Sequence, residues 1–378
     1  QVEFGAPPIA IAQMAKAMGH HFTAVTDHSY DLDDEFENYL KNDPALKKWK
    51  IFLTEVRFCN THFKDFIMIP GEEVSCGNGK GQNVHLLVFN NPEFIPGAGD
   101  SGEKWLHTRP DLKVEEITRQ SSGDALYFAA HPEMRIPFLQ RLLLRRNTWA
   151  WDDYRYENLR GLQICNGHPN GMAEGRQSWV KLLLRGEKKF IIAGSDAHGN
   201  FNRFRQIGMP HLYLHEQEAF HLFGQHRTVA FIDKQFSLQN LMSALNKGAA
   251  SVTSGPFLSI TGHGQAEEKV HIGGTLHGIP AVLDITAYST DEFGPLGRIL
   301  LFKGDIGSSK ESVLIDETMP FKSYGYHLQI PLPSPCESGS YYRSEVYCTS
   351  NSPLPIMAMT NPIWHFARNS FAVSPGLG

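Results

Sequence analysis

Short apolar runs that end in polar residues constrain the fold of the first half of this chain more than any other feature. Between residues 21 and 193 the runs are HFTAV, DFIMIP, QNVHLLVF, ALYFAA, LQIC and KFIIA. Runs of this length are typical of buried strands. Helical patterns accompany them at 5–19, with Pro8 in the first turn, and at 178–186, which Gly186 ends. Strands alternating with helices predict an α/β fold with a mostly parallel sheet.

The pattern changes after Asp233. Residues 237–248 predict one more amphipathic helix, with Ser237 as its N-cap and Gly248 as its stop. From TSGPFLSI onward, turns rich in Gly, Pro and Ser separate short alternating runs such as AVLDITAYS, YHLQIPL and SEVYCTS. We therefore expect an α/β domain over 1–255 and a smaller, sandwich-like β-rich module over 256–378, with the boundary near Gly255.

Composition excludes several classes of protein. The chain has 378 residues, a formal net charge of -5 and 41% hydrophobic residues, and no apolar run approaches the ~20 residues of a membrane-spanning helix. Without a basic field, long nucleic acid is not an expected partner. Five cysteines without a CxxC pair argue against both a disulfide framework and a thiolate zinc site. We expect a protein that acts on a small molecule and does not insert in a membrane. The compartment stays open, although the cysteine pattern favours the cytoplasm.

Imidazole and carboxylate side chains stand at the ends of the predicted strands. The candidate metal ligands are His28, Glu73, His85, His131, Asp196 and His198. Each of them alone is more often a hydrogen-bonded structural residue than a ligand. Together they are the donor set that suits zinc, manganese or iron. Because parallel strands bring their carboxyl ends to one edge of a sheet, we expect these side chains to converge.

The segment GSDAHGN, residues 194–200, is the sharpest local signal. Two ligating groups at positions i and i+2 of an extended chain project to the same side, so Asp196 and His198 can reach neighbouring metals. The alternative is an ordinary polar turn that happens to contain an Asp and a His. The buried strand directly before the segment favours the metal site.

Five stretches resemble a known family. They are TAVTDHSYDLDD at 23–34, MIPGEEVS at 68–75, NVHLLVFN at 83–90, AAHPE at 129–133 and IIAGSDAHGNFNR at 191–203. They resemble the PHP (polymerase and histidinol phosphatase) superfamily, and more closely its CehA/McbA-like metallohydrolase branch. The resemblance covers about residues 1–255, and the segments SGPFL and TNPIW are similar to the β-rich tail of that branch.

The resemblance implies a distorted (β/α)7 barrel that holds up to three metals. Glu73 would bridge two metals, ahead of its rival Glu72. His85 and His131 would complete one of those sites, and Asp196 would serve the other. The third metal would be held by His28 and His198.

The family also carries an H-x-H motif shortly before the helix with which this sequence opens. The resemblance therefore implies two further ligands upstream of Gln1. If the protein lacks them, one site keeps only Glu73 and Asp196, which favours a mononuclear or inactive protein.

These features predict a metal-dependent hydrolase, most simply a phosphoesterase, in which a hydroxide held between metals attacks the substrate. Glu73, Asp196 and His198 would be its catalytic ligands. Arg203 and Arg205 would clamp phosphoester oxygens, or are solvated surface arginines. At lower rank, Asn166 and His168 would touch the substrate, and Asp27 would orient a ligand histidine.

Two alternatives remain open. The same centre could hydrolyse a carboxylic or carbamic ester, and a decayed barrel could serve as a non-catalytic binding protein. Two other features are interpreted as structural. The basic run at 141–147 predicts the solvated face of an amphipathic helix, and Trp149 is expected to pack under its loop.

Overall fold

The structure, a computed structural model, describes residues 5–100, 108–120, 123–199, 201, 205–209, 212–216, 220–265, 267–350, 352 and 354–367. The chain forms two compact units. The first contains the described residues of 1–175 and 194–225, and the second contains those of 176–193 and 226–378.

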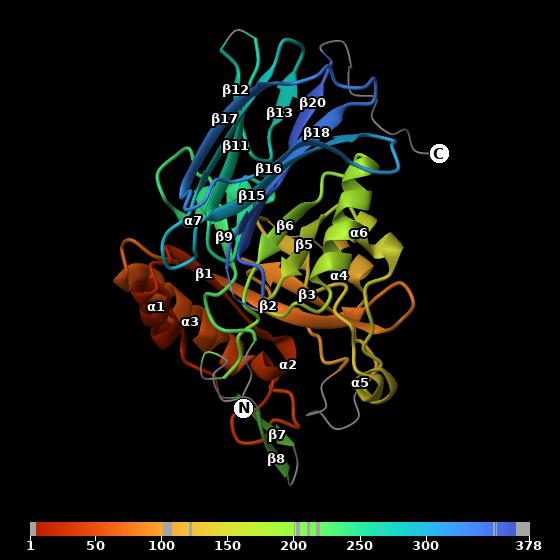
Figure 1. The fold of residues 1–378 in the computed structure, drawn as a ribbon. Coiled ribbons are helices and arrows are strands. Elements are labelled where there is room, and N and C mark those ends of the chain that lie inside the picture. The colour runs from red at the N-terminus through yellow and green to blue at the C-terminus, as the bar shows by residue number, and fades with distance from the viewer. Residues whose placement is uncertain are drawn as a thin grey trace. The chain divides into compact units, whose positions relative to one another are not determined.

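A curled sheet organises the first unit (Figure 1). Its strands follow the order of the chain: β1 (Phe22–His28), β2 (Ile67–Gly77), β3 (Asn83–Phe89), β4 (Leu126–Ala129) and β5 (Leu159–Cys165). The pairs β1–β2 and β4–β5 are parallel, whereas β3 is antiparallel to both neighbours. The prediction of a mostly parallel sheet is therefore wrong at β3. Only residues 78–82 connect β2 to β3, and a parallel crossover needs a dozen or more.

The direction of β3 decides which of its residues reach the site. In register, His85 near the start of β3 lies opposite Ser75 near the end of β2, and Glu73 lies opposite His28 at the end of β1. The beginning of an antiparallel strand thus reaches the edge at which its parallel neighbours end. This register brings three candidate ligands to one edge.

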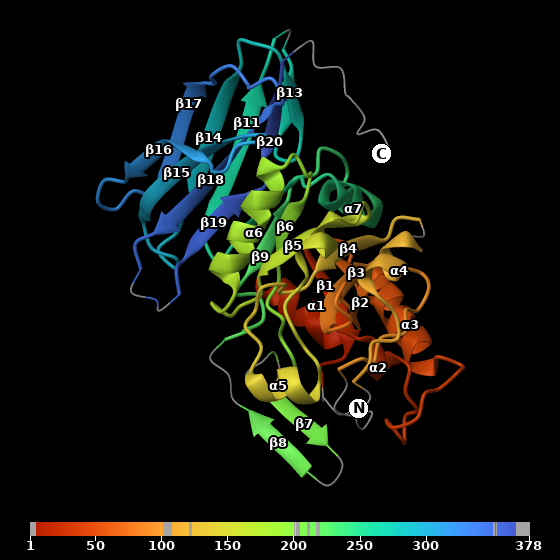
Figure 2. The same cartoon turned by 90° about the vertical axis from the view of Figure 1, so that its right-hand side faces the viewer.

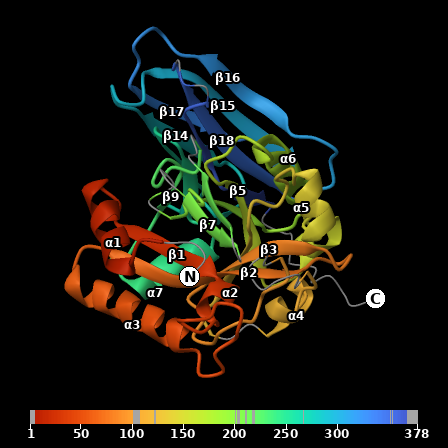
Figure 3. The ribbon, with the colours of Figure 1, turned by 90° about the horizontal axis from the view of Figure 1, so that it is seen from below.

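Helices cover the β1–β2 side of this sheet (Figures 1 and 3). They are α1 (Pro8–Ala17), α2 (Ser29–Leu32) and α3 (Lys47–His62), of which α2 and α3 lie in the crossover that the parallel β1–β2 pair requires. Apolar side chains of these helices and strands form one buried core: Ala12, Ala15, Val25, Leu32, Trp49, Phe52, Val56, Cys59, Phe66 and Met68. The helix predicted at 5–19 is confirmed, with Pro8 at its first position.

The rest of the first unit consists of short elements. They are α4 (Val114–Arg119), α5 (Phe138–Leu143), the 3-10 helix η1 (Trp151–Arg155), and the antiparallel pair β7 (Arg205–Met209) and β8 (Leu212–Glu216). Helix α5 ends at Leu143, so it covers only part of the basic run 141–147.

The second unit is rich in strands (Figure 2). Its elements are α6 (Met172–Leu184), which starts in the first unit, β6 (Phe190–Ala193), β9 (Arg227–Ala230), α7 (Leu238–Asn246), β10 (Ala250–Thr253), β11 (Phe257–His263), β12 (Lys269–His271), β13 (Thr275–His277), β14 (Val282–Tyr288), β15 (Leu296–Asp305), β16 (Ser312–Thr318), β17 (Gly325–Pro331), β18 (Ser340–Cys348), β19 (Met357–Thr360) and β20 (Ile363–Phe366). The strand-rich C-terminal part is confirmed.

Two sheets carry these strands, β6 excepted, in the described part of the second unit. One has the order β12-β11-β14-β17. The other has the order β13-β20-β18-β19-β10-β9, with β15 beside β18 and β16 beside β15. Apolar residues that alternate along the strands of both sheets share one buried core, among them Ile260, Ile285, Ile299, Val346 and Ile363. This alternation is the pattern of sheets that pack face to face.

Helix α7 begins and ends as expected. The Ser237 hydroxyl accepts the N–H of Asn240 at the start, and Gly248 adopts a φ of 68° just after the end. Strands β9 and β10 pair with each other, and β10 also pairs with β19. Residues 227–253 therefore pack with the strand-rich unit. A division into two domains near Gly255 stays a prediction.

Candidate functional site

The candidate ligands come from five segments of the first unit. His28 is the last residue of β1, Glu73 lies in β2, and His85 lies in β3. His131 follows β4 by two residues, and the segment after Ala193 carries Asp196 and His198. Because the strand ends meet at one edge, all six side chains belong to one region of the unit.

Glu73 is the centre of this region, with only 6% of its surface exposed. Its Oε1 contacts Nδ1 of His85, and Nε2 of His131 lies 3.1 Å from the same oxygen. The ring of His28 lies 5.2 Å from that of His85 and 5.9 Å from that of His198, measured between centroids. Imidazole rings from three segments thus surround one buried carboxylate, and the ring of His198 lies beside that of His28.

Electrostatics keep Glu73 ionised. Burial opposes the charged form, but the neighbouring His85 and His28 and the hydrogen bond with His131 outweigh it and hold the pKa of Glu73 well below its ordinary value. Burial likewise opposes a charge on His85, yet the carboxylates of Asp100 and Glu73 raise the pKa of His85 to about 9. The carboxylate is therefore available as an anionic ligand.

Asp100 fixes the orientation of the His85 ring. Nε2 of His85 lies 2.8 Å from Oδ2 of Asp100, and Nε of Arg146 lies 3.2 Å from the same oxygen. Burial of Asp100 favours its neutral form, but His85 and Arg146 lower its pKa instead. With Nε2–H donating to Asp100, Nδ1 is the nitrogen that faces Glu73 and that His85 can offer to a metal once it has lost its second proton, and carboxylates orient metal-binding histidines in this way.

The turn that carries Asp196 and His198 is not extended. Asp196 adopts a φ of 51°, in the left-handed region, so the expectation of an extended i, i+2 pair is wrong. The turn orients His198 by another route: its Nδ1–H donates to the backbone oxygen of Asp196 at 2.8 Å. This hydrogen bond leaves Nε2 of His198 as the ligand nitrogen.

The donor atoms form two groups that could each hold a cation. In one group, the ligand atoms of His28, Glu73 and His85 all lie within 4.8 Å of one another, and in the other those of Glu73, His131 and Asp196 do. Both groups contain Glu73. Imidazole nitrogens with carboxylate oxygens fit a divalent transition metal, and a shared carboxylate fits two neighbouring cations.

Glu72 points away from this centre. Its side chain is fully buried, accepts the Ser29 hydroxyl at 3.1 Å, and accepts the N–H of Ile95 at 3.2 Å. Burial raises the pKa of Glu72 to about 8. Successive residues of a strand face opposite sides of the sheet, and the preference for Glu73 over Glu72 follows from that alternation.

Asn166 and His168 lie beside the Asp196 turn. Nδ2 of Asn166 lies 3.4 Å from Oδ2 of Asp196. The ring of His168 lies 5.5 Å from that of His221. Asn166 thus contacts a candidate ligand, whereas contact of either residue with a substrate stays a prediction.

The remaining predicted site residues are not brought to the centre by described contacts. Asp27 is exposed and precedes His28 in β1, so its side chain faces the opposite side of the strand. Arg203 lies outside the described residues. Arg205 begins β7, and its side chain also lies outside the described part.

Sequence analysis missed three residues of the site: Asp100, Arg146 and His221. His221 lies with its Nδ1 3.4 Å from Oδ2 of Asp196. All three sit outside the helices and strands, so no periodic pattern marks them. The basic run at 141–147 was assigned to a helix face, but Arg146 lies beyond the end of α5 and pairs with Asp100.

One buried amide positions the segments that carry Asp100 and Arg146. Nδ2 of Asn83, at the start of β3, donates to the backbone oxygens of Gly99 at 2.5 Å and Leu144 at 2.7 Å. A Cβ at Gly99 would lie 2.2 Å from Oδ1 of Asn83, so only glycine permits this approach. A sequence signal for this contact exists: Asn83 is a polar residue at the start of an apolar strand, and Gly99 lies in a loop that follows the strand.

No protein-family model matches the chain, and no curated protein matches it. Among the described residues, every helix is too short or too polar to cross a bilayer.

Proposed function

We propose that the first unit is the catalytic part of a metal-dependent hydrolase, most simply a phosphoesterase of the PHP type. One observation carries the proposal: two groups of ligand atoms, each within 4.8 Å, share the buried carboxylate of Glu73. An anionic carboxylate shared by two adjacent groups of imidazole and carboxylate donors fits a pair of divalent cations. Zinc, manganese and iron are the metals that this donor set favours.

The residues would divide into ligands and groups that orient them. His28, His85, His131, Glu73 and Asp196 would hold up to two cations, and His198 would add its Nε2 on the side of His28. When bound, such cations supply Lewis acidity that lowers the pKa of a coordinated water and offsets charge developing on an ester. This chemistry requires no serine or cysteine nucleophile.

Neighbouring groups hold the ligands in place. Asp100 holds the His85 ring, and the backbone oxygen of Asp196 holds the His198 ring. Asn166 and His221 lie 3.4 Å from Oδ2 of Asp196, so they keep that carboxylate turned in a fixed direction. Partners of this kind set the tautomer and basicity of a ligand.

The finer architecture that we propose is the distorted (β/α)7 barrel of the PHP superfamily. The stretches TAVTDHSYDLDD and IIAGSDAHGNFNR support it, together with a curled sheet whose strands β1, β2 and β4 bring ligands to one edge. In this architecture the strand-rich second unit follows the catalytic part.

Metal analysis and ester assays on the full chain test the proposal. We expect at least one tightly bound divalent metal per chain, and turnover of nitrophenyl phosphate that exceeds turnover of nitrophenyl acetate. His131→Asn should lose metal, whereas His327→Asn, a change of an exposed histidine on β17, should retain it. Fewer than one metal per chain would favour a non-catalytic binding protein. Turnover of the acetate alone would assign the centre to carboxylic esters.

A further inference from the structure

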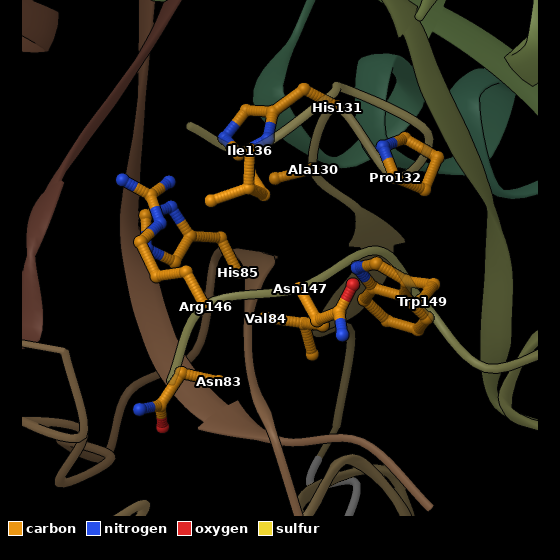
Figure 4. A pocket seen from close by; sticks show the side chains of 10 residues that line it. All are labelled: Asn83, Val84, His85, Ala130, His131, Pro132, Ile136, Arg146, Asn147 and Trp149. Atoms are coloured by element: carbon orange, nitrogen blue, oxygen red, sulfur yellow. The ribbon is translucent and has the colours of Figure 1, made fainter. Parts of the chain in front are cut away.

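A hollow opens directly beside two of the candidate ligands (Figure 4). Its lining residues are Asn83, Val84, His85, Ala130, His131, Pro132, Ile136, Arg146, Asn147 and Trp149. The space inside it that a water-sized group can occupy is about 10 Å³, far below the ~300–1,000 Å³ of pockets for drug-sized ligands. The hollow therefore suits a compact group that reaches the metal centre from the side of His85 and His131.

Arg146 brings a cation to this pocket. Its ion pair with Asp100 uses Nε. Within the described part of the chain no side-chain acceptor engages the terminal amino groups of the guanidinium, so they can bind a ligand. Figure 4 shows the guanidinium beside the ring of His85 on one side of the pocket. A guanidinium fork binds oxyanions with two parallel hydrogen bonds.

Trp149 brings a hydrogen-bond donor on the opposite side. Its side chain is 6% exposed, and its indole N–H has no acceptor among the described residues. Figure 4 shows this nitrogen on the edge of the ring that faces the other lining residues. Stacking on Tyr154, at 5.7 Å between centroids and 11° between planes, holds the ring in place. A buried N–H without a partner is unfavourable, and a ligand oxygen in the pocket would satisfy it.

We propose that this pocket binds the phosphoryl group of a small phosphoester, with Arg146 and the Trp149 N–H as oxygen-binding groups. This inference rests on the proposed hydrolase function. A tetrahedral phosphoryl group presents oxygens in divergent directions and so can meet donors on opposite walls, whereas the two oxygens of a carboxylate lie in one plane. The apolar wall of Val84, Ala130, Pro132 and Ile136 fits a short uncharged organic substituent.

Calorimetric titration of the manganese-loaded full chain with inorganic phosphate, and with acetate, tests the pocket. We expect phosphate to bind more tightly than acetate. Arg146→Gln should weaken phosphate binding about 10- to 100-fold, as loss of a charge-assisted hydrogen bond does, and Trp149→Phe about fivefold. Arg145→Gln, which changes the exposed neighbouring arginine, should leave phosphate affinity unchanged. Metal content should be the same in all variants.

Several outcomes would overturn the proposal. If Arg146→Gln and Trp149→Phe both bind phosphate as tightly as the wild type does, the pocket is not the phosphate site. Binding of acetate more tightly than phosphate would also contradict the proposal. If Arg146→Gln loses metal because Asp100 has lost its ion pair, that variant no longer tests the pocket. The phosphate affinity of Trp149→Phe then tests the proposal by itself.

The same measurements separate this inference from the function on which it rests. If Arg146→Gln and Trp149→Phe turn over nitrophenyl phosphate with an unchanged KM, the hydrolase function is supported and the phosphate pocket is rejected. If phosphate binding depends on Arg146 but the protein turns over no ester, the phosphate pocket is supported and the hydrolase function is rejected.

Discussion

The first and the second unit each bury a cluster of charged side chains, the one around Glu73 and the other around Arg343. Arg343 is 2% exposed. Its Nε and Nη2 donate to the two oxygens of Glu311 at 2.7 and 2.6 Å, and its Nη1 donates to Glu345. Glu345 also accepts from Arg176 at 2.8 Å and from the Tyr347 hydroxyl at 2.6 Å. Opposite charges and hydroxyls thus satisfy this cluster from within the protein.

The cluster around Glu73 is built differently. Two imidazole nitrogens, from His85 and His131, converge on the same carboxylate oxygen. Imidazoles can be neutral ligands, whereas a guanidinium cannot lose its proton. A charge cluster that is complete in itself stabilises a fold, and one built from titratable ligands suits an added cation. This difference supports a structural role for the second cluster and the proposed metal-binding role for the first.

The largest effect that we predict is on the structural cluster. Arg343→Met leaves Glu311 and Glu345 buried without their main cation, and breaking one side of a buried ion pair costs about 3–5 kcal/mol. Urea denaturation should show a loss of this size, with or without added metal. Arg176→Gln removes a partner that is 38% exposed, so its cost should be about 1 kcal/mol or less. Equal losses in the two variants would contradict the comparison.

The next largest effect concerns Glu73. A metal at 100 times its Kd should raise the unfolding free energy of the wild-type chain by about 2.7 kcal/mol. Glu73→Gln should abolish this increase, because an amide cannot supply an anionic ligand. Glu72→Gln is the matched control: the pKa of Glu72 is raised to about 8, so the amide resembles the neutral acid. Urea denaturation with and without metal measures the metal-dependent stabilisation of both variants. If metal still stabilises Glu73→Gln, Glu73 is not an essential metal ligand.

A smaller effect is expected at Asp100. Asp100→Asn should weaken metal binding about 10- to 100-fold, the usual result of losing a partner that orients a ligand histidine. Competition with a chelator of known affinity measures the change. Asp124→Asn, at an exposed position of the first unit, should bind metal like the wild type. Wild-type affinity in Asp100→Asn would show that the His85 ring needs no such partner.

The smallest effect is a difference in pH response between the clusters. In metal-free protein the pKa of His85 is raised from about 6.5 to about 9, so the stabilisation from its charged form is complete below about pH 6.5 and is lost as pH rises through 9. Burial opposes ionisation of Glu345, but Arg343 lowers its pKa below 4.5. That stabilisation is complete above pH 4.5 and is lost in acid.

Hydrogen exchange of metal-free protein measures the two responses separately. Protection of β2 and β3 should fall toward alkaline pH, and protection of β15 and β18 should fall toward acid. The same pH response in both pairs of strands would contradict the distinction.

The amino-acid sequence by itself determined the local elements and most of the proposed ligand set. Pro8 at the start of α1, the Ser237 cap of α7 and the positive φ of Gly248 are local effects, so they can be read from neighbouring residues. Polar residues that follow apolar runs marked His28 and Glu73. The expectation that Glu73 ends its strand is wrong, because β2 continues to Gly77 through its pairing with β3.

Tertiary structure alone decided the surroundings of those ligands. Asp100 and Arg146 reach His85 because the Asn83 amide holds the backbone of both their segments, a contact between residues far apart in sequence. The left-handed Asp196 likewise depends on its surroundings, because isolated residues other than glycine seldom adopt that conformation. Local patterns encode how a segment folds, whereas the orientation of a ligand depends on groups that only the folded chain brings together.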